Sequence, residues 1–187
     1  MRWIREACGR EIAEAAEGDP IRSALLAAIT ANESGGSRQA YRFAPANYER
    51  LLGLLAGNET KVDGVTRAQL EKRLNAVKKE SDRALLLKQL AGLHGYTGLP
   101  GYLSIVWKEP LEALTEKDRH FQLAAQRLED VCRQFELDPA KHAAEIGRCW
   151  NAGCPNGRMR LAMYSWRLQE RIRLYVGNLT GLPGAHC

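Results

Sequence analysis

Apolar residues recur at intervals of three and four along most of the chain, the spacing that places them on one face of a helix. In the N-terminal part this pattern predicts helices over residues 3–17 and 20–33. Gly18 ends the first helix, and Asp19-Pro20 is typical of an N-cap followed by a first-turn proline. The second helix carries a continuous apolar run, Ala24 to Ile29, which indicates a buried position.

The middle of the chain contains further helical segments separated by glycine and proline. The stretch "YERLLGLLAG" predicts a short helix, and residues 58–65 read as a turn-rich link. Residues 66–92 have helical spacing throughout and predict one helix or two, with Thr66 as N-cap. Residues 93–110 are rich in glycine and proline and break the helical pattern.

The C-terminal part again has helical spacing. It predicts a long helix over 115–136, a helix that starts at Asp138-Pro139, and a last helix over 158–177 that ends at Gly177. No alternating pattern long enough for a sheet appears. We therefore expect an all-α or mainly α fold of seven or eight helices. The length of the chain suits a single domain, residues 1–187, with residues 58–92 as a helical insertion or lobe within it.

Charge narrows the choice of partners. The net charge of +5 and the pI of about 9.0 favour anionic partners, namely nucleic acid, wall polymers or membrane surfaces. No apolar run is long enough for a membrane span. The N-terminus is interrupted by charges and does not resemble a secretory signal, so export would use a route without a cleaved signal, unless the chain stays in the cytoplasm or has lost a leader.

Cysteine and histidine spacing does not favour a metal site. The five cysteines form no CxxC pair, although Cys149 and Cys154 are close enough in sequence for a local disulfide. His94 and His120 have no second ligand at metal-binding spacing. We expect neither a metal nor another cofactor.

The stretch "AITANESGG", residues 28–36, places Glu33 at the end of an apolar helix. A helix C-terminus carries a partial negative charge, so we expect this position and partial burial to raise the pKa of Glu33. A carboxyl that stays protonated near neutral pH can act as a general acid. Gly35 and Gly36 would let the chain turn and leave space beside it. The simpler alternative is a solvated last-turn glutamate.

Two other short motifs stand out. Gly101-Tyr102-Leu103-Ser104-Ile105 follows a glycine-rich loop, and Trp150-Asn151-Ala152-Gly153 follows a helix. Taken alone, the first is a loop that packs its apolar residues, and the second is an ordinary helix C-cap.

Together and in this order, the three motifs resemble those of the lysozyme-like lytic transglycosylases, a group close to the goose-type lysozymes and phage muramidases. That family has a Glu-Ser pair ending an apolar helix, then a G-L-M-Q-I-like turn, a helix, and a Y-N-A-G-like stretch. Glu33-Ser34 matches the first, Gly101 and Ile105 match the ends of the second, and Trp150 to Gly153 match the last. Residues 120–138 resemble the intervening helix, and Tyr175-Val176 resembles a later Tyr-Val pair.

The resemblance covers roughly residues 20–177, except for an unalignable segment over 37–92. It implies a lysozyme-like helical domain with a groove between two lobes. The chain departs from the family at two positions. Ser104 stands where glutamine is usual, which shortens a substrate-contacting side chain, and Trp150 replaces a tyrosine and loses its hydroxyl.

The resemblance also implies an activity: cleavage of the β-1,4 bond between N-acetylmuramic acid and N-acetylglucosamine in peptidoglycan. Glu33 would act first as acid and then as base, leaving 1,6-anhydro ends. A muramidase-type hydrolase, endolysin-like, remains the alternative if a second carboxylate lies about 6.5–9.5 Å from Glu33. Glu49, Glu59 and Asp63 are the candidates.

The remaining site residues are expected to contact substrate. Ser34 would hold the glutamate, the 101–104 turn would line an acetamido pocket, and Asn151 would donate a hydrogen bond. Tyrosine rings would stack on sugar faces, unless they are only half-buried rings with hydroxyls in water. The predicted substrate-binding residues are Ser34, Tyr41, Tyr102, Leu103, Ser104, Trp150, Asn151, Tyr164 and Tyr175.

The expected partner is therefore the glycan strand of peptidoglycan, in the periplasm or outside the cell, reached by phage lysis, a virion or a dedicated secretion route. A secreted toxin would also have an inhibitor or immunity protein. Two other classes stay open: a non-catalytic peptidoglycan-binding module, and a basic helical nucleic-acid binder. The second has no readout motif in its favour. Its only support is the arginine-rich last helix, which otherwise reads as a solvated face: Arg158, Arg160, Arg167, Arg171 and Arg173.

Overall fold

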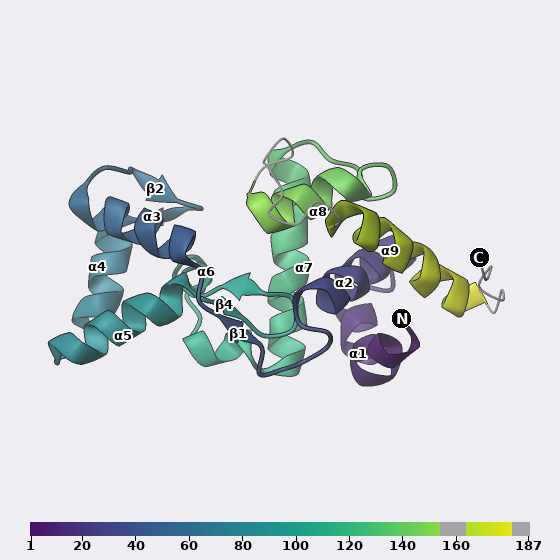
Figure 1. The fold of residues 1–187 in the computed structure, drawn as a ribbon, viewed down its shortest axis with the longest axis horizontal. Helices are drawn as coiled ribbons and strands as arrows, with labels where there is room; N and C mark the ends of the chain where they lie inside the picture. The colour runs from purple at the N-terminus through teal and green to yellow at the C-terminus, as the bar shows by residue number, and fades with distance from the viewer. Residues whose placement is uncertain (154–163, 181–187) are drawn as a thin grey trace. The chain divides into compact units, whose positions relative to one another are not determined.

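The computed structural model describes residues 1–153 and 164–180, and Figure 1 shows their ribbon. The predicted mainly α fold is confirmed. The described residues form nine α-helices, one short 3-10 helix and five strands of two residues each. The count exceeds the expected seven or eight because the glycine-rich segment 93–110 contains a further short helix, α6 (Leu103–Trp107).

Chain contacts divide the protein into two compact units. Unit 1 consists of Met1–Ser37 together with the chain from Lys117 onward, and unit 2 consists of Arg38–Glu116. Residues 58–92, which we expected to form an insertion, lie within unit 2. Each unit is described below by itself.

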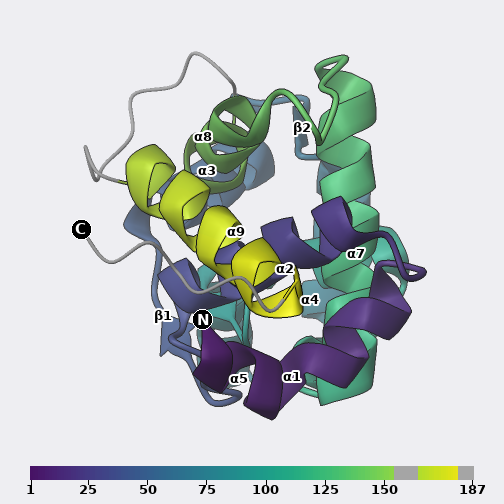
Figure 2. The ribbon, with the colours of Figure 1, turned by 90° about the vertical axis from the view of Figure 1, so that its right-hand side faces the viewer.

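Unit 1 is built around a buried helix, α2 (Pro20–Glu33). Its residues from Ser23 to Ala31 are all buried, as expected of a helix that is apolar on every side. It packs against α1 (Arg2–Ala15) and α9 (Tyr164–Thr180), and α9 also packs against α8 (Ala143–Ala152), as Figures 1 and 2 show. The long helix α7 (Lys117–Gln134) lies against α1. Burial of α2 therefore fixes where its C-terminal residue Glu33 is placed.

Both ends of α2 follow their local sequence signals. At the start, an oxygen of Asp19 accepts hydrogen bonds from the Ile21 and Arg22 amides, at 2.8 and 3.1 Å, which confirms the predicted N-cap. At the end, Gly36 has a φ of +82°. A Cβ there would lie 2.9 Å from the Trp3 ring. Glycine at this position therefore allows the backbone that follows α2 to pass close to α1.

The predicted start of the helix at Asp138-Pro139 and the predicted end of the last helix at Gly177 are wrong. Asp138-Pro139 does not start a helix, because Asp138 closes a local turn instead: its side chain accepts from the Ala140 amide and its carbonyl accepts from the His142 amide. α8 begins only at Ala143. α9 continues past Gly177 to Thr180. Arg158 and Arg160, which we expected on this helix, lie outside the described residues, as does Cys154, the proposed partner of Cys149.

Unit 2 combines short helices with two small antiparallel sheets. Strands β1 (Tyr41–Arg42), β4 (Leu93–His94) and β5 (Leu99–Pro100) form one sheet in the order β1-β4-β5, with Tyr41 and His94 paired across it. Strands β2 (Lys61–Val62) and β3 (Val65–Thr66) form a hairpin. The helices are α3 (Pro45–Ala56), α4 (Arg67–Asn75), α5 (Glu80–Ala91), α6 and the 3-10 helix η1 (Leu111–Leu114).

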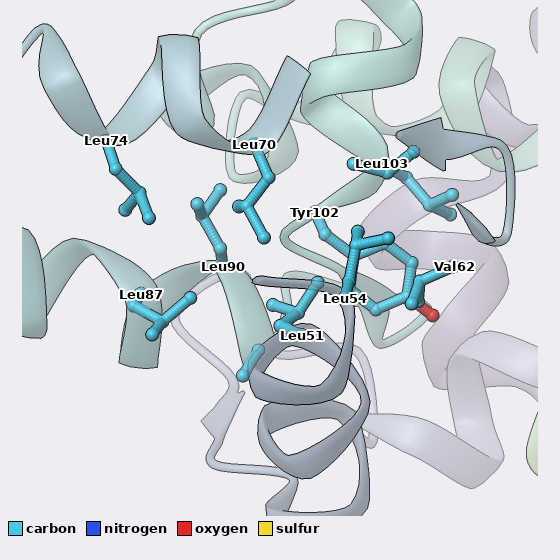
Figure 3. Close-up of a cluster of buried hydrophobic side chains, with 11 residues drawn as sticks. Leu51, Leu54, Val62, Leu70, Leu74, Leu87, Leu90, Tyr102 and Leu103 are labelled. Carbon is cyan, nitrogen blue, oxygen red and sulfur yellow. The ribbon is translucent and has the colours of Figure 1, made fainter. Parts of the chain in front are cut away.

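One apolar cluster holds unit 2 together, and Figure 3 shows most of its side chains. It joins α3, α4, α5, the β2–β3 hairpin and the start of α6. Its buried members are Leu51, Leu54, Val62, Val65, Leu70, Leu74, Leu87, Leu90, Ala91, Tyr102 and Leu103. Two residues predicted to bind substrate, Tyr102 and Leu103, thus belong to this core.

The predicted N-cap at Thr66 is confirmed and is part of a complete capping box with Gln69. The Gln69 amide donates to the Thr66 hydroxyl at 3.4 Å, and the Gln69 side chain accepts from the Thr66 amide at 2.9 Å. Replacing Thr66 with alanine should lower the free energy of unfolding by about 1 kcal/mol and speed hydrogen exchange in the first turn of α4. Thr66→Ser, which keeps the acceptor oxygen, should retain both values; equal losses in the two variants would exclude a capping role.

In the parts of the chain that the structure describes, we find no helix with the length and apolar character required to cross a bilayer.

Candidate functional site

Glu33 is the last residue of α2 and is half-buried. One of its carboxyl oxygens accepts a hydrogen bond from the hydroxyl of Tyr164 at 2.8 Å. Tyr164 is the first described residue of α9, and it is only 4% exposed. Two residues predicted separately for the site, 131 positions apart in sequence, are therefore in direct contact within unit 1.

Burial and the neighbouring carboxyl keep Tyr164 protonated. Burial raises the pKa of Tyr164 well above its ordinary value, and the charge of Glu33 and the hydrogen bond to it raise that pKa further. The phenol therefore remains a neutral donor across the physiological pH range. It orients the Glu33 carboxyl without placing a full positive charge beside it.

Asn32 and Arg171 extend the contact between the two helices. The Asn32 side-chain amide donates to the Tyr164 carbonyl at 3.5 Å, and its oxygen accepts from an Arg171 guanidinium nitrogen at 2.5 Å. We refer to Asn32, Glu33, Tyr164 and Arg171 as the α2–α9 junction. Sequence reasoning missed Asn32 as a site residue and placed Arg171 only in a charged run. The available signal was the seven-residue spacing of Tyr164 and Arg171, which puts them on one helix face.

The turn after Glu33 is held by Ser34. Its hydroxyl donates to the Thr30 carbonyl at 3.2 Å and accepts from the Gly36 amide at 3.0 Å. We expected Ser34 to hold the glutamate, whereas these two bonds hold the backbone of the turn. At Gly35, which is exposed and has a φ of +62°, a Cβ would meet no other described atom within 4 Å, so the turn that follows Glu33 is open to solvent at this position.

Three other predicted residues also lie in unit 1. Trp150 and Asn151 are half-buried near the end of α8. The Asn151 side-chain oxygen is buried and has no hydrogen-bond partner among residues 1–153 and 164–180. Tyr175 lies further along α9 and is 3% exposed, and Arg5 and Cys8 of α1 are among its neighbours. Burial raises the pKa of Tyr175, and this position gives the ring a packing role in unit 1.

The other four predicted residues lie in unit 2. Tyr102, Leu103 and Ser104 are buried, so their side chains pack inside the unit. The Tyr102 hydroxyl donates to Asp63 at 2.5 Å, and the Ser104 hydroxyl has no hydrogen-bond partner in the described chain. A role in an acetamido pocket stays a prediction for this segment.

Tyr41 is the exposed member of the predicted set in unit 2, at 51%. Its ring centre lies 5.2 Å from that of His94 in a tilted arrangement, and its hydroxyl donates to the Lys88 carbonyl at 3.4 Å. A Cβ on Gly92 would lie 2.3 Å from the Tyr41 ring, so glycine at that position allows the ring to rest on the backbone.

The carboxylates considered as a second catalytic group are all in unit 2. Asp63 and Glu59 both lie near Arg50, at 3.3 and 4.0 Å from its guanidinium nitrogens. Glu49 is exposed on α3. Burial by itself lowers the pKa of Arg50, but Asp63, Tyr102 and Glu59 raise it overall. The Arg50 guanidinium therefore stays charged.

The described chain contains no candidate metal centre, and the depression that the structure shows in unit 1 lies away from Glu33. Nowhere in this part do three His, Cys, Asp or Glu side chains gather closely enough to hold a metal ion. An open depression of about 570 Å³ in unit 1 includes Arg22, Cys132 and Pro139. Arg22 lies near the opposite end of α2, about 16 Å from Glu33 along the helix axis.

Comparison of the chain with known protein families, curated proteins and solved structures finds no match. The functional assignment therefore depends on the site itself and on the motif resemblance.

Proposed function

We propose that the protein cleaves peptidoglycan as a lysozyme-like lytic transglycosylase, with Glu33 as its single acid and base. The observation that supports this most is the hydrogen bond from buried Tyr164 to Glu33, and the turn that follows Glu33 is open to solvent at Gly35. A half-buried carboxyl that a neutral phenol holds in one orientation can exchange a proton with a bound substrate, as a general acid and base must. The order of the Glu33-Ser34, Gly101 to Ile105 and Trp150 to Gly153 motifs directs the choice of substrate.

The geometry suits a group that must donate a proton and then take one back. Glu33 would protonate the oxygen of the β-1,4 bond as that bond breaks, and the substrate's own acetamido oxygen would bond to C1. The substrate 6-hydroxyl would then displace the acetamido oxygen and lose its proton to Glu33. The Tyr164 hydroxyl would stabilise the carboxylate between the two steps, because a hydrogen bond to the charged form favours it.

This cycle needs no second carboxylate, and that distinguishes it from an inverting hydrolase. Within unit 2, Glu59 and Asp63 already lie beside Arg50. The proposed site of action is the bacterial cell wall, and glycan strands are the proposed partner. An inhibitor or immunity protein would be a further partner if the protein is a secreted toxin.

The test is to incubate the full chain with purified peptidoglycan and to identify the released muropeptides by mass. Ends in the 1,6-anhydro form would support the proposal. Reducing ends would instead indicate a muramidase-type hydrolase. Binding to peptidoglycan without any release would indicate a non-catalytic binding module.

Tyr164→Phe should lower the cleavage rate about tenfold, because it removes the hydrogen bond to Glu33 but keeps the buried ring. The rate of muropeptide release measures this effect. Tyr48→Phe, a half-buried ring on α3, is the matched control and should leave the rate unchanged. An unchanged rate in Tyr164→Phe would mean that the phenol does not assist the glutamate.

A further inference from the structure

Two arginines lie one turn apart on α9, and one of them, Arg171, belongs to the α2–α9 junction. Arg167 and Arg171 follow Tyr164 by three and seven residues, so all three lie on the same face of the helix. Arg171 is anchored by Asn32, whose oxygen lies 2.5 Å from its guanidinium nitrogen. Arg167 is exposed and Arg171 is half-buried. Arg171 is thus held beside Asn32, the residue before Glu33, and Arg167 lies one turn earlier on the exposed side of α9.

This pair of cations has no carboxylate partner in the described part of the chain. The nearest acid along α9, Glu170, pairs instead with Arg173 at 2.7 Å. Among residues 1–153 and 164–180, the hydrogen-bond partner of Arg171 is the neutral Asn32 amide. Burial and, next, the charge of Arg167 lower the pKa of Arg171, as expected for two guanidinium groups one turn apart on a helix.

Two like charges at i and i+4 destabilise a helix. Partial desolvation of an unpaired guanidinium adds to that cost. A bound anion would offset both effects, and the planar guanidinium fork matches a carboxylate best.

We propose that Arg167 and Arg171 form a subsite that binds a carboxylate of the glycan substrate beside Glu33, an inference that rests on the proposed function. Peptidoglycan carries carboxylates in two places. The lactyl group of N-acetylmuramic acid has one where the peptide stem is absent, and the stem peptide has its own where it is present. Either source supplies the planar anion that the pair would bind.

The test measures binding of three soluble glycan oligomers to the full chain carrying Glu33→Gln, which prevents turnover. The first oligomer has no stems and free lactyl carboxylates. The second has stems with free carboxylates, and the third has the same stems fully amidated. We expect the first or the second to bind at least tenfold more tightly than the third, and the tighter of the two identifies the source of the carboxylate.

Arg167→Gln should remove this preference while leaving affinity for the amidated oligomer unchanged. Arg133→Gln, an exposed arginine on α7 that changes net charge equally, should retain the preference. Equal affinity for all three oligomers would overturn the subsite, as would a preference that survives in Arg167→Gln.

The binding test can fail or succeed independently of the proposed cleavage activity. A carboxylate preference lost in Arg167→Gln would support the subsite even if the unmodified chain released no muropeptides, in which case only the cleavage proposal fails. Muropeptide release by a chain that shows no carboxylate preference would overturn the subsite alone.

Discussion

Glu33→Gln should abolish muropeptide release, lowering the rate by about a thousandfold or more, which is within the range attributed to general acid–base catalysis. Glutamine has nearly the same shape but cannot give up a proton to the leaving oxygen. Its side-chain oxygen can still accept the hydrogen bond from Tyr164, so the α2–α9 junction should remain intact. Mass analysis of the released fragments measures the loss.

Two controls separate a chemical effect from a structural one. The thermal unfolding midpoint of Glu33→Gln should stay close to that of the parent chain. Glu14→Gln, in the last turn of α1 and 67% exposed, removes a comparable carboxylate and should leave the rate unchanged. Cleavage that persists in Glu33→Gln would refute Glu33 as the acid.

Gly101→Ala should destabilise unit 2 by about 3 kcal/mol, the upper range for overpacking. A Cβ at this position would lie 2.5 Å from the Gln89 carbonyl oxygen and 2.9 Å from the Leu90 Cα. Both are backbone atoms at the end of α5, so no side-chain rotation relieves the clash. The Gly101 amide also donates to the Gly92 carbonyl at 2.8 Å, which holds the two segments together.

Gly53→Ala is the matched comparison within the same unit. Gly53 lies inside α3, and a Cβ there would meet its nearest neighbours only at 3.8 Å. This substitution should raise the free energy of unfolding by about 0.5–1 kcal/mol, because alanine loses less backbone entropy in a helix. Urea unfolding followed by circular dichroism measures both variants. Equal stability of Gly101→Ala and Gly53→Ala would contradict the close approach of the Gln89 and Leu90 backbone to Gly101.

Helices with strong end signals could be predicted to the residue. Pro20–Glu33 matches the expected bounds because Asp19 supplies a cap and the Ser-Gly-Gly turn ends the apolar run. Thr66 was identified as a cap for the same reason. The two small sheets could not be predicted, because strands of two residues are too short to show an alternating pattern.

The candidate site was only partly predictable. Glu33 could be singled out because a carboxylate ending an apolar helix is unusual. The contact with Tyr164 could not, since it joins residues far apart in the chain. Tyr102 and Ser104 were expected to face substrate, but both are buried in unit 2.

The sequence by itself determined that the chain is mainly helical, where α2 begins and ends, and that Glu33 ends it, because caps, turns and helical periodicity are local properties. Only the tertiary structure decided what surrounds that glutamate. Packing of α9 against α2 placed a buried phenol on the carboxyl and set Arg171 against Asn32. Such neighbours depend on which buried faces pack together, and that is a property of the whole fold rather than of any short stretch.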